Sequence, residues 1–309
     1  MNEAWGERLE GKQVQRWVQP VGERLVDEGW EAVRESESGR PPAGPENAPA
    51  LLVIGLDGGR VQMREKDPET ESRWKEDKVA TVTSYLPGTA EEVPQALVTT
   101  HVATMEGAEQ FGGLARVEAE RRGLARAGAV VVLGDGGNWI DPLAAREFSQ
   151  ATRIVDFYHA AEHLHACSRA LWGVGTAKAT RWAEKLTHQL RAGRVDLVIQ
   201  TLRRQAAQLG PPRPADGTDH VRRVVSNEVG YFEVNSPHMQ YARYRRRGWP
   251  IGSGNVEAGV KQFNKRVKGT EQFWSRQGVE AILALRALLL CQDDRWKRYW
   301  RARPAYLAA

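Results

Sequence analysis

The order of extended and helical segments between residues 50 and 175 is the feature that most constrains the fold. Three segments rich in Val, Leu and Thr are followed by alternating helical and extended patterns. The extended patterns lie at 50–65, 78–86, 95–104, 129–136 and 152–158, and the helical ones at about 108–127, at 141–148 and from His159 onward. Successive strands predict a meander, and strands that alternate with helices predict further strands beside it. The sequence therefore predicts an α/β fold around one mixed sheet.

The segments on either side of this pattern divide the chain of 309 residues further. Residues 1–35 have apolar residues near helical spacing and predict a short N-terminal helical segment. The stretch 36–49 is rich in Pro, Gly and Ser and predicts a linker. Residues 176–245 are rich in Arg and largely helical in pattern. They indicate a helical insertion between a first part of the core, 50–175, and a second part with C-terminal helices, 246–309.

Composition excludes several classes of protein. The N-terminus carries acids and no apolar run, so we expect no signal peptide. The longest apolar stretch, AILALRALLL, is interrupted by Arg286 and is too short to span a bilayer. Cys167 and Cys291 are far apart and provide neither a disulfide framework nor a zinc knuckle. We therefore expect a reduced, cytoplasmic protein without a membrane segment, and its formal charge of +5 permits binding to nucleic acid.

Two apolar runs end in the same way. LLVIGL is followed by Asp57 and two glycines, and AVVVLG is followed by Asp135 and two glycines. An ordinary Asp-Gly turn is an alternative explanation for each site taken alone. If both runs are central strands of one sheet, the two carboxylates lie about 5–10 Å apart at a sheet edge, where α/β proteins bind ligands. Adjacent carboxylates repel each other unless a cation bridges them, and oxygen ligands favour Mg²⁺ or Mn²⁺ over Zn²⁺.

A third carboxylate, Glu257, stands in the stretch PIGSGNVEAGVKQFNKRVKG. The simple explanation is an acid in the first turn of a helix, favoured by the helix dipole and paired with Lys261. Apolar residues at helical spacing predict a buried stripe on this helix, made of Val256, Val260, Phe263 and Val267. Glu257 would lie at the border of that stripe, at the head of a row of lysines. This geometry suits a metal-binding carboxylate beside DNA phosphates, as two-metal phosphoryl transfer requires.

Basic residues on either side of Glu257 are the predicted DNA contacts. They are Arg243, Arg245, Arg246, Arg247, Lys261, Lys265, Arg266 and Lys268. The stretch YARYRRRGW mixes arginines with aromatic rings, which suits contact with phosphates and stacking on unpaired bases. A solvated basic turn is the plainer alternative. We expect Trp274 in the core, with a role in holding a flipped base as its alternative.

Four stretches together resemble the ISKra group of bacterial insertion-sequence transposases, which is similar to the wider Mutator-like DDE transposases. They are GLDGGRVQMRE, VVLGDGGNWI, IVDFYHAAEHL and GWPIGSGNVEAGVKQFNKRVKGTEQFW, and the likeness covers roughly residues 50–300. The resemblance implies a ribonuclease H-like core with a helical insertion before the last acid. It implies Asp57, Asp135 and Glu257 as a catalytic triad that binds two Mg²⁺ or Mn²⁺ ions, supported by Asp156 and His159.

The resemblance also implies the partners and the cellular location of the protein. The partners would be transposon ends, target DNA and further copies of the chain on that DNA, in the bacterial cytoplasm and at the nucleoid. Residues 1–35 would be a remnant of a longer DNA-binding region. Two alternatives stay open: a ribonuclease H-like nuclease without strand transfer, and a truncated or domesticated copy that only binds DNA.

The motif HAAEH at 159–163 has a separate explanation. It fits the pattern of inverted zinc peptidases, in which His159 and His163 share a metal. The plain structural alternative places both histidines on the solvated side of their helix.

Overall fold

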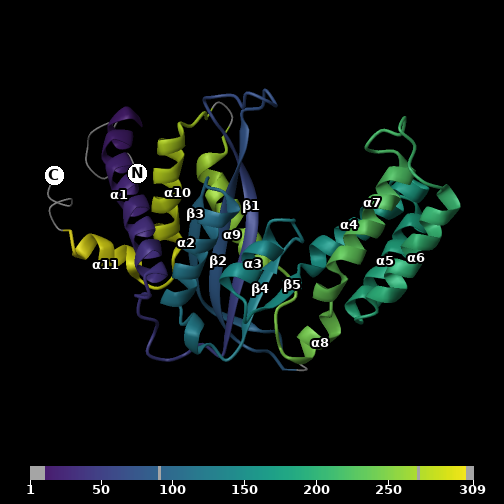
Figure 1. Cartoon of the computed structure of the whole chain (residues 1–309), viewed down its shortest axis with the longest axis horizontal. Helices are drawn as coiled ribbons and strands as arrows, with labels where there is room; N and C mark the ends of the chain where they lie inside the picture. Colours follow the sequence, from purple (N-terminus) through teal and green to yellow (C-terminus); the bar gives the residue numbers. More distant parts are fainter. Residues whose placement is uncertain (1–10, 90–91, 270–271, 304–309) are drawn as a thin grey trace.

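One five-stranded mixed sheet forms the centre of the computed structural model, which describes residues 11–89, 92–269 and 272–303 (Figure 1). The strands are β1 (Leu51–Gln62), β2 (Trp74–Leu86), β3 (Gln95–Thr104), β4 (Val130–Gly134) and β5 (Thr152–Val155). Their spatial order is β3-β2-β1-β4-β5. The first three strands pair antiparallel, and β4 and β5 continue the sheet parallel to β1. The prediction of an α/β fold around one mixed sheet is confirmed.

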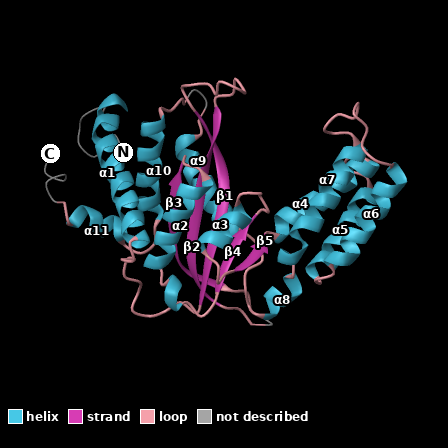
Figure 2. Cartoon of the chain, in the orientation of Figure 1, coloured by secondary structure: helices cyan, strands magenta, loops and turns pink. Residues whose placement is uncertain are grey.

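Helices cover both faces of the sheet (Figure 2). The helices α2 (Ala108–Arg121), α3 (Ile140–Glu147) and α4 (Phe157–Trp172) follow β3, β4 and β5 in the predicted order. Because side chains alternate along a strand, Leu52, Ile54 and Leu56 of β1 pack toward α2 and α3. On the opposite face, Val61 packs with α9 (Gly254–Val267) and α10 (Arg276–Leu290). The sheet is thus the middle layer of three.

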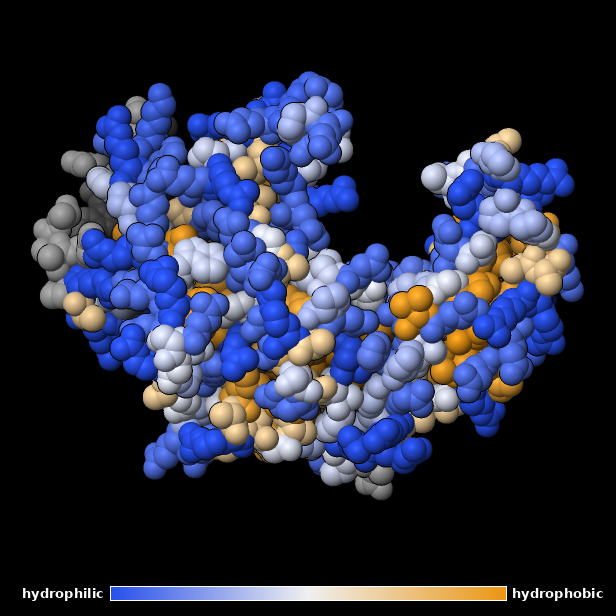
Figure 3. All heavy atoms as spheres, viewed as in Figure 1, coloured by the Kyte–Doolittle hydropathy of each residue, from blue (hydrophilic) through white to orange (hydrophobic). Residues whose placement is uncertain are grey.

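Residues 176–245 form the predicted helical insertion. Its helices are α5 (Ala177–Arg191), α6 (Val195–Leu209), α7 (Val221–Asn235) and the short α8 (Tyr241–Arg246). Helix α4 packs against α5 and α7, so it joins the core to this bundle. Figure 1 shows the bundle standing at the β5 side of the molecule. The space-filling view shows the molecule hollowed between the bundle and the sheet (Figure 3).

The predicted N-terminal segment is helix α1 (Gly11–Glu37), and residues 1–10 of that prediction lie outside the described residues. Helix α1 packs along α10 and α2. The packing is close at Gly22, where an added Cβ would lie 2.3 Å from the carbonyl oxygen of Ala281. The helix α11 (Arg295–Arg301) packs on α10 as well. The N-terminal helix is therefore an outer layer of the core, and the linker begins only after Glu37.

Several strand boundaries differ from the prediction, and two of the differences have a clear physical reason. Strand β2 begins at Trp74, before the predicted residue 78, because it pairs with β1 as far as Gln62. Strand β5 ends at Val155, because the next residue, Asp156, caps α4. Within the described residues, no helix is both long enough and apolar enough to cross a bilayer.

Candidate active site

Strands β1 and β4 bring two aspartates side by side. The parallel register ends with Leu56 opposite Gly134, so Asp57 and Asp135 are the next residues on adjacent strands. Neighbouring strands lie about 4.8 Å apart. The prediction that both apolar runs are adjacent central strands is therefore confirmed.

The glycines after Asp57 do not form the predicted turn, since β1 continues to Gln62 in pairing with β2. They make room for neighbouring acids instead: a Cβ on Gly59 would lie 2.5 Å from Oδ1 of Asp77. A turn does follow Asp135. There Gly136 has a φ of +90°, a conformation that favours glycine, and Gly137 N–H donates to Asp135 Oδ1 at 2.9 Å. Asp57 thus stands where β1 extends beyond β4, and not at a strand end.

Helix α9 brings Glu257 to the same place. The helix approaches β1 closely at Gly55, where an added Cβ would lie 3.0 Å from Cβ of Val256. The predicted stripe of this helix is buried, with Val256, Val260, Phe263 and Val267 each at most 7% exposed. Glu257 lies at the border of that stripe, with 47% of its side chain exposed and Lys261 Nζ at 3.5 Å. Such an exposed, long pair stabilises a helix little.

The acids of this region act on one another electrostatically. Burial raises the pKa of Asp57 to about 6; a hydrogen bond from Gly58 N–H at 2.7 Å opposes the rise, and the charges of Asp135, Glu257 and Asp156 add to it. A divalent cation fits this donor set, because all ligands are carboxylate oxygens and the ion would hold Asp57 ionised. Among the described residues, no three His, Cys, Asp or Glu side chains stand at metal-ligand spacing. The acids share one region without forming a closed cage.

Asp156 connects the elements that carry these acids. Its buried carboxylate accepts hydrogen bonds from Tyr158 N–H at 2.6 Å and His159 N–H at 2.9 Å, and another from Ser253 N–H. Its own N–H donates to the Gly134 carbonyl at 2.8 Å. Asp156 therefore fastens the end of β4 and the start of α4 to the residue that precedes α9. This position fits the supporting role implied for it.

The histidines of HAAEH contact Tyr231 of helix α7, so the expectation that both lie on the solvated side holds only in part: 40% of the His159 side chain is exposed and 27% of the His163 side chain. His163 Nδ1 lies 2.7 Å from Oε2 of Glu228, and its Nε2 lies 3.2 Å from Nε2 of His159. The ring of Tyr231 stacks on His163 with ring centres 3.8 Å apart. Glu162, the acid of the peptidase motif, is 79% exposed, and its Oε2 lies 4.0 Å from Nδ1 of His159. The sequence did not reveal this cluster, because Glu228 is 65 residues from His163.

The predicted DNA contacts fall into two separate groups. Arg243, Arg245, Arg246 and Arg247 lie on or just after α8, and the Gly248 carbonyl that follows accepts a hydrogen bond from Gly88 N–H at 2.9 Å. Gly88 comes directly after β2, which there pairs with the start of β1. Helix α8 therefore lies at the amino end of β1, opposite the β1–β2 hairpin, as Figure 1 shows. The structure does not bring these arginines to the carboxylates.

The second basic group lies along α9. Lys261, Lys265, Arg266 and Lys268 are exposed there and follow Glu257 toward the β1–β2 hairpin. Trp274 is partly buried beside this helix, and its Nε1–H donates to the Val267 carbonyl at 2.9 Å. That contact agrees with the expected core position of Trp274.

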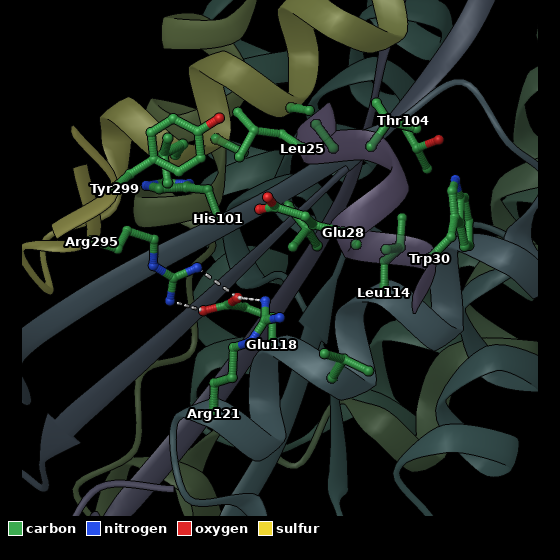
Figure 4. Close-up of a pocket in the computed structure, with 18 of the residues that line it drawn as sticks. Leu25, Glu28, Trp30, His101, Thr104, Leu114, Glu118, Arg121, Arg295 and Tyr299 are labelled. Carbon is green, nitrogen blue, oxygen red and sulfur yellow. Dashed lines mark hydrogen bonds and ion pairs between the residues drawn. The ribbon is translucent and has the colours of Figure 1, made fainter. Parts of the chain in front are cut away.

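A cavity of about 560 Å³ lies away from these acids, lined by residues of α1, α2, α10, α11 and β3 (Figure 4). Arg295 donates to both carboxylate oxygens of Glu118 there, at 2.8 and 2.6 Å. Arg121 lies 3.5 Å from the same carboxylate. None of the predicted catalytic residues lines this cavity.

Comparisons with known proteins add one weak similarity. No protein-family model matches the sequence, and no curated protein matches it significantly. Among solved structures, the chain is similar to one described as the Drosophila P element transposase strand transfer complex. The identity is 12% over 90% of this chain and 85% of that chain, with a TM-score of 0.35. Overlap this low establishes neither a shared fold family nor a shared chemistry.

Proposed function

We propose that this chain is a DDE transposase with a ribonuclease H-like core, which cleaves DNA at transposon ends and joins the resulting 3′-hydroxyl to target DNA. One observation supports the proposal above all. Asp57 lies on β1, Asp135 directly follows the adjacent strand β4, and Glu257 of α9 lies near both, although the helical bundle separates it from them in the sequence. Three antiparallel strands followed by two parallel ones, with helices between, are the order that the resemblance implies. The partners would be DNA and further copies of the chain.

Asp57, Asp135 and Glu257 would hold two Mg²⁺ or Mn²⁺ ions. Such ions supply an activated attacking oxygen and stabilise the leaving oxygen in phosphoryl transfer. The chain's own contribution would be to carry three carboxylates into one region, with Asp156 joining the elements that bear them. The lysines of α9 would follow the phosphates of the reacting strand, and the arginines of α8 would contact DNA farther from it.

The direct test is metal-dependent cleavage of DNA that carries the sequences flanking the gene. Asp57→Asn, Asp135→Asn and Glu257→Gln should each abolish cleavage in Mg²⁺ and Mn²⁺ while DNA binding persists. Because shared metal ligands act as one unit, double variants should be no worse than single ones. Glu162→Gln, which changes an exposed acid on α4, is the matched control and should cleave normally.

The products separate the alternatives. A strand-transfer product in addition to cleavage supports the transposase, and cleavage without joining identifies a nuclease. Wild-type protein that binds DNA and never cuts would leave only the DNA-binding alternative. Near-full activity in any one of the three variants would remove that residue from the triad.

A further inference from the structure

The histidine pair on α4 has the geometry of two ligands that share one ion. Imidazole nitrogens bound to one tetrahedral ion at about 2.0–2.1 Å lie about 3.3 Å apart, with ring centres about 5 Å apart. Here the Nε2 atoms of His159 and His163 are 3.2 Å apart, and the ring centres are 4.9 Å apart. A linear hydrogen bond between the same atoms would hold the ring centres about 5.5 Å apart. The contact between the two nitrogens is therefore bent, which is the arrangement that two ligands of one ion would also have.

Glu228 prepares His163 for this role. Glu228 is 8% exposed, and its Oε2 lies 2.7 Å from Nδ1 of His163. A proton on Nδ1 would donate to this carboxylate and leave the Nε2 lone pair of His163 available to an ion. A carboxylate behind a histidine is the usual outer partner of a metal-bound imidazole. Tyr231 stacks on the ring with an interplanar angle of 17° and fixes its plane. Glu228 and Tyr231 both come from α7, so the inserted bundle builds this half of the site.

The ligand type points to a different ion from the one proposed for the strand aspartates. Imidazole nitrogen suits Zn²⁺, Ni²⁺ and Cu²⁺, whereas Mg²⁺ requires oxygen. In the described part of the chain no third His, Cys, Asp or Glu completes a ligand set with this pair. The other coordination positions would be open to water, since 40% of the His159 side chain is exposed.

We propose that His159 and His163 bind one Zn²⁺-class divalent ion through their Nε2 atoms, with Glu228 as the residue that orients His163. The site differs from the peptidase pattern, because its acid is Glu228 of α7 and not Glu162 of the same helix.

Calorimetric titration of the metal-free protein with Zn²⁺ tests the proposal. The protein must carry no histidine tag, because a tag would bind Zn²⁺ itself. We expect one ion per chain. His159→Asn and His163→Asn should abolish this binding, and Glu228→Gln should weaken it about 10- to 100-fold. His165→Asn is the matched control, a partly exposed histidine on the same helix, and should bind like the wild type. Unchanged affinity in Glu228→Gln would reduce the site to a chance pair of helical histidines and overturn the proposal.

Two further measurements keep the result independent of folding and of DNA cleavage. Co²⁺ bound to the wild type should shift the N–H proton resonances of two imidazoles; the absence of such shifts would overturn the site even if a histidine variant failed to fold. Asp57→Asn should retain Zn²⁺ binding with unchanged affinity. Loss of Zn²⁺ binding in that variant would place the ion among the carboxylates instead.

Discussion

Two of the regions that hold acids partly or fully out of water stabilise them in opposite ways. In the cavity of Figure 4, the Glu118 side chain is fully buried and Arg295 donates to both of its carboxylate oxygens. Burial lowers the pKa of Arg295, and the bonds to Glu118 and Asp293 more than offset this, so that the pKa rises. At the strand aspartates, burial and neighbouring negative charges act in the same direction and raise the pKa of Asp57 to about 6.

This difference separates a structural use of charge from a functional one. A buried acid with a bidentate arginine is neutralised within the fold, and it costs little as long as both partners remain. An acid whose pKa is raised by burial and by neighbouring negative charges lowers stability when it is ionised, and strongly perturbed acids of this kind are frequent at functional sites. We therefore assign the Glu118–Arg295 pair to the scaffold, and the raised pKa of Asp57 agrees with the catalytic role proposed for it.

The largest effect on stability should come from breaking the neutralised pair. Glu118→Gln removes the negative charge and leaves the Arg295 guanidinium buried with only Asp293 beside it. Loss of one partner of a buried ion pair costs about 3–5 kcal/mol, and Asp293 should keep the loss near the lower end. Urea unfolding at pH 7 measures it. The double variant Glu118→Gln, Arg295→Met should recover much of the loss; a cost below about 1 kcal/mol for the single variant would break the comparison.

At Asp57, in contrast, removal of the negative charge should increase the free energy of unfolding. The pKa of Asp57 is about 6 in the folded chain and 3.8 as its ordinary value, so folding takes up a proton between these limits. The ionised carboxyl therefore destabilises the fold above pH 6, and this penalty disappears as the pH falls to about 4. Asp57→Asn should stabilise the metal-free chain by about 3 kcal/mol at pH 7–8 and have little effect near pH 4.

Unfolding curves at both pH values, recorded in EDTA, measure this effect. Asparagine can still accept the bond from Gly58 N–H, so the variant isolates the charge. Added Mg²⁺ should then stabilise the wild type and not the variant. Equal stabilisation at pH 4 and pH 8 would mean that packing, and not charge, distinguishes Asp57.

Sequence reasoning located the parts of this molecule that depend on local pattern. Apolar runs placed Asp57 and Asp135 on their strands, and spacing along one helix identified Val256 and its neighbours as buried. It missed contacts between distant segments, such as Glu118 with Arg295, which are 177 residues apart. It also left a turn at Gly58 and Gly59 open as an alternative, because the need for space beside Asp77 on a paired strand leaves no signature in the sequence.

The position of α8 was missed for a related reason. Its arginines precede Glu257 closely in the chain, and the sequence analysis named them together with the α9 cations as DNA contacts. The chain between them crosses from the amino end of β1 to the carboxylates, and Phe157 N–H donates to the Ile251 carbonyl at 2.8 Å on the way. Proximity in sequence was therefore a poor guide to proximity in space.

The smallest expected effect concerns the cations of the two regions, Arg295 beside the cavity and the lysines of α9. Arg295 is buried and neutralises an acid of the fold, whereas Lys261 is 74% exposed and meets Glu257 only at 3.5 Å. If the α9 cations serve DNA, Lys261→Ala and Lys265→Ala should leave the Tm unchanged. Each should flatten the dependence of log K on log salt by about one unit for any short duplex. Lys297→Ala, an exposed lysine on α11 that pairs with Asp294, is the matched control and should leave the slope unchanged. A loss of thermal stability with unchanged DNA binding would make these lysines equivalent to Arg295, and the contrast between the two regions would then fail.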